Sequence, residues 1–131
     1  MQPRRVIFPD TLPFVFAVGR SALPDATHVS KRPGTLVKGT TYVQYRNDSG
    51  GESGLLKTER WGVNVHAPSM RDAFDAARLL QAAFRSSANG APVVAATGGA
   101  GPYEIVDEAG AVDSHAHAYF TFELTVRGSN Y

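Results

Sequence analysis

The stretch from Ser69 to Ser87, SMRDAFDAARLLQAAFRSS, decides the fold of this chain. Its apolar residues recur at steps of three and four, the spacing of one face of an α-helix: Met70, Phe74, Ala77, Leu80 and Phe84. Charged residues fall on the remaining faces: Arg71, Asp75, Arg78 and Arg85. The pattern predicts an amphipathic helix that covers a hydrophobic core.

The sequence also marks both ends of this helix. Ser69 is a favourable N-cap residue that follows Pro68, and Asp72 stands three residues later, in the first turn. Asn89 and Gly90, with a proline two residues beyond, predict the end of the helix.

Segments on both sides of the helix alternate between apolar and polar residues, as strands with one buried face do. The clearest are Lys57 to Ala67 and the closing run from His115 to Arg127, and Thr40 to Arg46 is a third. Val93 to Ala96 and Tyr103 to Asp107 are expected to be short strands. In the Lys57 strand Trp61, Val63, Val65 and Ala67 share the apolar face. His66 lies on the polar face, and both it and His28 are expected at the surface.

The N-terminal segment fits either a helix or a strand. Helical spacing is shown by Leu12, Val15, Phe16, Gly19 and Leu23, with Asp10 as the cap and Pro13 in the first turn, whereas the run from Phe14 to Phe16 suits a strand. The helix is favoured. The fold class is therefore α+β, a mostly antiparallel sheet of about four to five strands covered by two helices, in a single domain spanning residues 1–131.

Composition limits the function. The chain has 131 residues, enough for one core, and it contains no cysteine, which removes thiolate nucleophiles and cysteine-based zinc sites. Its longest apolar stretch, Leu12 to Val18, is too short to span a bilayer and lacks signal-peptide flanks, so synthesis in the cytosol without membrane attachment is expected. A net charge of +1 argues against a dedicated nucleic-acid binder.

Charge is unevenly divided between the two halves of the chain. Residues 1–65 carry nine Lys and Arg against five Asp and Glu, whereas residues 66–131 carry four against seven. Such asymmetry suits a subunit that meets copies of itself head to tail, although it also fits ordinary solvated surface.

Catalytic motifs fail on inspection. The glycines near position 100 lead into a proline and lack a P-loop lysine, and neither a G-x-S-x-G nor an H-E-x-x-H pattern occurs. The one constellation worth weighing places Asp113, His115 and His117 on one strand face, where they could hold a divalent metal with His66 as a further partner. An ordinary polar sheet face explains the same residues. No catalytic residue, cofactor or metal ligand is therefore assigned.

Two further segments are candidates for contact with partners. The connection from Asn47 to Gly54 is longer than a tight hairpin needs, and its central residues are Asp48, Ser49, Gly50, Gly51, Glu52 and Ser53. Lys31 and Arg32 form a small basic turn. Together with the helix charges Arg71, Asp75, Arg78 and Arg85, these residues are the candidate interface residues.

The order of these segments is more specific than any one motif. KRPG at residues 31–34 precedes TYVQYRNDSGG, then LLKTERWGVNVHAPSMRDAFDAARLLQAAF, GPYEIVDEAGAV and finally HAHAYFTFELTVRG. Over nearly the whole chain this order resembles the tail terminator proteins of long-tailed phages, especially those infecting actinobacteria, and of related gene-transfer particles.

The resemblance implies a structural subunit of the virion without enzymatic activity. Such subunits are expected to form a hexameric ring on the tail tube protein, to stop tube polymerisation and to join the head-tail connector or stopper. The ring would act at the tail-neck junction after assembly in the host cytoplasm, and the genome would pass through it without specific binding. Alternatives are a head-to-tail stopper or another neck adaptor of similar fold and, further off, a small metal-dependent hydrolase that uses Asp113, His115 and His117.

Overall fold

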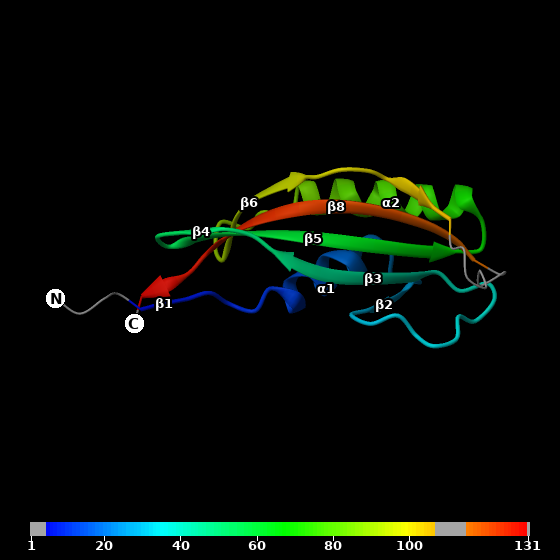
Figure 1. The fold of residues 1–131 in the computed structure, drawn as a ribbon, viewed down its shortest axis with the longest axis horizontal. Coiled ribbons are helices and arrows are strands. Elements are labelled where there is room, and N and C mark those ends of the chain that lie inside the picture. Colours follow the sequence, from blue (N-terminus) through cyan, green and yellow to red (C-terminus); the bar gives the residue numbers. More distant parts are fainter. Residues whose placement is uncertain (1–4, 107–114, 131) are drawn as a thin grey trace.

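A computed structural model describes residues 5–106 and 115–130. The described residues form two helices on one face of a twisted sheet, and Figure 1 shows both helices behind the strands. The helices are α1 (Leu12–Ala22) and α2 (Met70–Arg85). The strands are β1 (Val6–Ile7), β2 (Thr27–Val29), β3 (Tyr42–Ser49), β4 (Glu52–Ser53), β5 (Leu56–Ala67), β6 (Val93–Gly98), β7 (Tyr103–Ile105), β8 (Ala116–Arg127) and β9 (Ser129–Asn130).

Seven of the strands form the main sheet, in the order β2-β3-β5-β8-β6. The short strand β4 pairs with β5, and β7 pairs with β8 beyond the end of β6. All neighbours are antiparallel except β2, which runs parallel to β3. The expectation of an α+β fold with a mostly antiparallel sheet and two helices is confirmed.

The predicted number of strands, four to five, is wrong, because the described residues form nine. All five expected strands are present. The additional ones have only two or three residues, too few to show a period of two in the sequence: β1, β2, β4 and β9. Their existence depends on neighbours distant in sequence, as when β1 pairs with β9 through Val6 and Asn130.

The core lies between the sheet and the two helices. Tyr45 of β3 contacts Phe16 of α1 and Phe84 of α2, with ring centroids 5.5 and 5.9 Å apart. Phe84 also stacks on Phe122 of β8 at 4.0 Å. From Ala118 onward one face of β8 is completely buried, as its alternation predicts: Ala118, Phe120, Phe122, Leu124 and Val126. The opposite face of the sheet carries no helix from the described residues (Figure 1), and we call it the open face.

The predicted start of helix α2 is confirmed, and its last residue lies two residues before the predicted Ser87, but the predicted stop signal at Asn89 and Gly90 is wrong. The Ser69 hydroxyl accepts the amide hydrogen of Asp72 at 3.1 Å, as an N-cap should. The helix ends at Arg85 rather than near Gly90. The Ser86 and Ser87 hydroxyls donate to carbonyls of the last turn, those of Ala82 and Phe84, and thereby satisfy groups that a glycine cap would otherwise serve.

The N-terminal segment is a helix, in agreement with the favoured alternative. Thr11 is its N-cap residue, while the Asp10 carboxylate accepts the amide hydrogen of Leu12 at 3.0 Å. Pro13 lies in the first turn, where its missing amide hydrogen costs nothing. Neither helix in the described part of the chain is long and apolar enough to cross a membrane.

Candidate interaction surfaces

The segment expected to be a long loop is largely a β-hairpin. Asn47 to Ser49 continue strand β3, and Glu52 and Ser53 form β4 and pair with Lys57 and Leu56 of β5. Figure 1 shows this hairpin extending beyond the end of the main sheet. It contains the candidate interface residues Asp48, Ser49, Gly50, Gly51, Glu52 and Ser53, all of which are exposed.

Local geometry stiffens the bend of this hairpin. The Asn47 side-chain oxygen accepts the amide hydrogen of Ser49 at 2.8 Å, and Ser49 adopts a positive φ of 63°. Gly50 passes so close to β5 that a Cβ there would lie 2.2 Å from the carbonyl oxygen of Thr58. Beyond it, the amide of Thr58 donates to the Gly51 carbonyl at 2.8 Å. The segment is therefore held against β5.

The hairpin tip is tied to the two termini of the domain. The amide of Gly128 donates to the carbonyl of Leu55 at 2.7 Å, at the point where β8 leads into β9. A Cβ on Gly128 would lie 2.6 Å from Val6 of β1, so this position requires glycine. We call residues 48–56 together with β1 and β9 the hairpin end. A hollow of about 540 Å³ beside it is lined by Ile7, Pro9, Ala91, Pro92, Arg127, Gly128 and Ser129.

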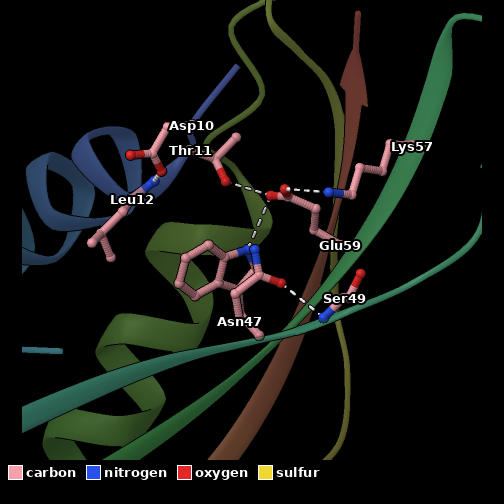
Figure 2. A network of polar contacts seen from close by, with 8 residues as sticks. Asp10, Thr11, Leu12, Asn47, Ser49, Lys57 and Glu59 are labelled. Atoms are coloured by element: carbon pink, nitrogen blue, oxygen red, sulfur yellow. Dashed lines mark hydrogen bonds and ion pairs between the residues drawn. The ribbon is translucent and has the colours of Figure 1, made fainter. Parts of the chain in front are cut away.

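Figure 2 shows a polar network that fixes the start of α1 against β5. The Glu59 carboxylate is only 2% exposed; it accepts hydrogen bonds from the Thr11 hydroxyl and from the indole nitrogen of Trp61, the latter at 3.3 Å. Lys57 reaches the other carboxylate oxygen at 3.7 Å. The face assignment of this strand from the sequence overlooked Glu59, which lies on the buried face with Trp61. Its place two residues from Trp61 on an alternating strand was the available signal.

The charged residues of α2 do not act as one group. Asp75 pairs with Arg71 at 4.0 Å and with Arg78 at 3.6 Å along the exposed side of the helix. Arg78 also lies over the Phe74 ring, 5.3 Å from its centroid. Arg85 lies apart, against Gly98 of β6, where an added Cβ would be 2.7 Å from its Nε. Exposed pairs of this kind contribute little to stability, typically about 0.5 kcal/mol or less. These charged side chains can therefore form contacts with a partner protein at little cost to the fold.

The basic turn with Lys31 and Arg32 directly follows β2, the strand at one edge of the sheet. Both residues are exposed, as is Lys38 in the same connection. This connection returns to β3 along the edge of the sheet, where the Tyr42 hydroxyl accepts the amide hydrogen of Val37 at 2.8 Å. The turn is thus a feature of the β2 edge and does not belong to the hairpin end.

The two described histidines of the constellation weighed for metal binding, His115 and His117, are engaged in other contacts. Asp113 lies outside the described residues. His115 Nε2 lies 2.7 Å from the carbonyl oxygen of Thr40, and His117 Nε2 lies 2.7 Å from the side-chain oxygen of Asn64. Within residues 5–106 and 115–130, no group of three or more His, Cys, Asp or Glu side chains is placed to hold a metal ion.

Two histidines expected at the surface are not there. His66 is 3% exposed, and its ring stacks on that of His117 with centroids 4.1 Å apart. His28 is half-buried between Tyr45, whose hydroxyl lies 2.8 Å from Nδ1, and the carbonyl oxygen of Leu23, 2.8 Å from Nε2. Burial lowers the pKa of His28, and nearby Arg20 lowers it further, against the raising effect of the bond to Leu23. Burial has the opposite effect on Tyr45 and raises the pKa of its hydroxyl, because the neutral form is favoured in both cases.

A shallow apolar groove of about 470 Å³ runs between the two helices, on the side away from the sheet. It is lined by Phe14, Ala17, Val18, Ser21, Ala22, Ala83, Ser86 and Ser87. Among the described residues, its lining side chains are apolar or carry a hydroxyl, and none is ionisable. The groove therefore offers an apolar packing surface.

The surfaces described above are the hairpin end, the two sheet edges, the charged side of α2 and the interhelical groove. Comparison with known proteins adds no assignment, since no protein-family model and no curated protein matches the chain.

Proposed function

We propose that this protein is a structural subunit of a phage tail, which forms a closed ring on the end of the tail tube, ends its polymerisation and joins the tail to the head connector. The observation that carries the proposal is the ordered pattern from KRPG to HAHAYFTFELTVRG, which resembles tail terminators along nearly the whole chain. Assembly into the ring would take place in the host cytoplasm, and the finished ring would be part of the virion at the tail-neck junction.

The arrangement of surfaces supports a role in assembly. A closed ring needs two different faces on each subunit, so that one face of a copy meets the other face of the next. The sheet ends in two unlike edges, β2 on one side and β6 with β7 on the other. The hairpin end lies beyond the sheet and remains available for a partner above or below the ring.

We assign the hairpin end to the contact with the tail tube. It is anchored at two places, by the Thr58 bond to Gly51 and by the Gly128 bond to Leu55, and a preorganised surface loses less entropy on binding than a free loop. Ile7 and Leu56 are 50% and 43% exposed there, which gives the contact an apolar centre. Shortening the hairpin is expected to leave the domain folded and to impair tail joining; normal attachment of heads to tails assembled with the shortened protein would refute this assignment.

The genome is expected to pass through the ring without specific binding. The net charge of +1 offers little phosphate neutralisation, and binding to DNA should be weak and sequence-independent. The function requires neither a cofactor nor a catalytic residue.

Electron microscopy of the purified protein, with and without tail tubes, tests the proposal. Rings that cap tubes and block further addition of tube subunits are expected. A ring that leaves tube growth unchanged but binds the connector would favour the stopper alternative. Loss of an esterase or phosphatase activity on metal removal would instead support the hydrolase, with His117→Ala as the variant that should abolish it.

A further inference from the structure

Strands β2 and β7, at opposite edges of the sheet, lie at the same height along the strand direction. A row of paired residues crosses the whole sheet from β2 to β7: Thr27, Tyr42, His66, His117 and Ile105. The next row on the same face of the sheet is Val29, Gln44, Asn64, Tyr119 and Tyr103. The strands β2 and β7 have three residues each, so one edge segment matches the other in height and in length.

The two edges also have matching directions. Strand β2 runs with β3, β3 runs against β5, β5 against β8, and β8 against β7. Strands β2 and β7 therefore have opposite polarity in the order of the sheet, while the sheet's twist turns their axes by about 20–25° per strand. If a second copy adds its β2 beside β7, turned to follow the twist of the sheet, the two strands meet as antiparallel neighbours, the commoner of the two arrangements.

We propose that β7 of one copy pairs with β2 of the next, so that the Thr27 row continues from subunit to subunit. This inference rests on the proposed ring and names the surfaces that would close it. Within residues 5–106 and 115–130, no strand pairs with the outer side of either segment. Because both segments lie at one level, pairing them requires no shift along the strands between copies, and such a head-to-tail contact forms a ring where the rotation between copies closes.

Side chains at the two edges complement one another. On the β7 side, Tyr103 and Val106 are 53% and 76% exposed, and Glu104 is exposed between them. On the β2 side, the following connection presents an exposed apolar residue, Val37, among basic ones: Lys31, Arg32 and Lys38. Glu104 on one edge thus faces a connection with three basic residues, with the exposed Asp25 before β2 as its one acid among the described residues 24–40, which favours head-to-tail contact over contact between like edges.

The shortness of the edges fits a specific contact. Strands β6 and β7 both pair with β8 and form one edge of the sheet. This edge is interrupted between them by the turn from Gly99 to Pro102. A long unbroken edge would invite open-ended aggregation, whereas short segments restrict the pairing to one register. The second copy can therefore add three residues of pairing on each side and no more.

Engineered disulfides test the pairing in the full-length protein, which has no cysteine of its own. The double variant Thr27→Cys with Ile105→Cys puts one thiol on each edge in the shared row. Within one chain these positions are four strand spacings apart, about 19 Å. A disulfide spans Cα atoms no more than about 7 Å apart, so any bond must link two copies.

The matched control is Thr27→Cys with Val94→Cys, since Val94 lies on the same edge in β6. Its neighbour Val93 pairs with Val126, nine residues along β8 from the His117 that pairs with Ile105, or about 30 Å. Mild air oxidation with a copper-phenanthroline catalyst should convert more than half of the Thr27/Ile105 protein into a ladder of linked copies. The control pair and the single variants should give less than one tenth of that ladder.

Each outcome decides the inference. Absence of the ladder while wild-type protein forms rings would overturn the edge pairing and leave the proposed function standing. An equal ladder from the control pair, or a protein that stays monomeric without linkage, would also overturn it. A ladder from a protein that fails to cap tubes would support the pairing and refute the terminator function. If Ile105→Cys disturbs folding, Val29→Cys with Tyr103→Cys tests the neighbouring row in the same way.

Discussion

The indole nitrogen of Trp61 donates to the carboxylate of Glu59 at 3.3 Å, in the buried layer between β5 and the start of α1. The same carboxylate oxygen accepts the Thr11 hydroxyl. A charged side chain at this depth is costly unless it is hydrogen-bonded and paired. The Glu59 contacts therefore bind the N-terminal helix to the central strand.

Replacing Glu59 by alanine should be strongly destabilising. The change leaves the Thr11 hydroxyl and the Trp61 indole buried without their acceptor, and each unsatisfied group costs about 1–3 kcal/mol. The expected loss in free energy of unfolding is on the order of 3 kcal/mol. Glu59→Gln retains an acceptor oxygen and loses the pair with Lys57, so it should cost less. Urea unfolding followed by fluorescence checks both, because Trp61 is the only tryptophan; equal stability of Glu59→Ala and wild type would contradict the role of the network.

Gly19 on α1 should resist even a methyl group. A Cβ at this position would lie 1.9 Å from the Tyr45 hydroxyl oxygen. Gly19→Ala should therefore lower the free energy of unfolding by about 1–3 kcal/mol, although alanine is the better helix former. Gly34→Ala is the control, since a Cβ there meets nothing within 4 Å. Equal stability of Gly19→Ala and the Gly34→Ala control would contradict the clash with Tyr45.

The histidine at position 28 should make stability depend on pH. The Leu23 carbonyl can only accept, so Nε2 carries the proton and Nδ1 accepts from Tyr45, which describes a neutral ring. Burial lowers its pKa below 6.5. The unfolded chain thus binds the proton first on acidification, and the contribution of His28 is complete above pH 6.5 and is lost as the pH falls through 6.5 toward the folded value.

Urea unfolding at several pH values between 5 and 8 measures this effect as a difference. The free energy of unfolding should fall more steeply on acidification in the wild type than in His28→Gln. Because His66, His115 and His117 remain in both proteins, their contribution cancels in the comparison. Identical pH dependence of the two proteins would contradict the lowered pKa.

The two adjacent glycines of the hairpin form a matched pair for testing its function. Gly50→Ala would drive a Cβ to 2.2 Å from the Thr58 carbonyl oxygen, whereas Gly51→Ala meets nothing within 4 Å. The first change should displace the hairpin and reduce tail joining at least tenfold, while the second should leave joining near wild type. Fluorescence of Trp61 should show both variants folded. Equal joining by the two variants would argue that the hairpin does not contact the tube.

Periodicity predicted the elements that bury a whole face and failed for those that depend on distant partners. The helix from Met70 and the strand ending at Arg127 have ten or more residues each, so their patterns are unambiguous. The start of α2 was also predictable, because the Ser69 cap is local. Its end was not, because serine hydroxyls cap the last turn and Gly90 belongs to the following turn.

The candidate surfaces show the same division. The exposure of Asp48 to Ser53 followed from their polarity, but the hairpin they form depends on pairing with β5 and on the bond from Gly128 to Leu55. The burial of His66 was missed because its ring is covered by His117 of β8, which is remote in sequence, whereas the burial of Glu59 was indicated by its place two residues from Trp61. The equal height of β2 and β7 along the strand direction depends on the register of five strands. That register cannot be predicted from any local sequence pattern.

Electron microscopy of tail tubes polymerised with and without the purified protein tests the central claim most directly. The proposed function predicts a ring of this protein at one end of each tube and no further growth when more tube subunits are supplied. Tubes that continue to elongate at the same rate, with no ring at their ends, would contradict it.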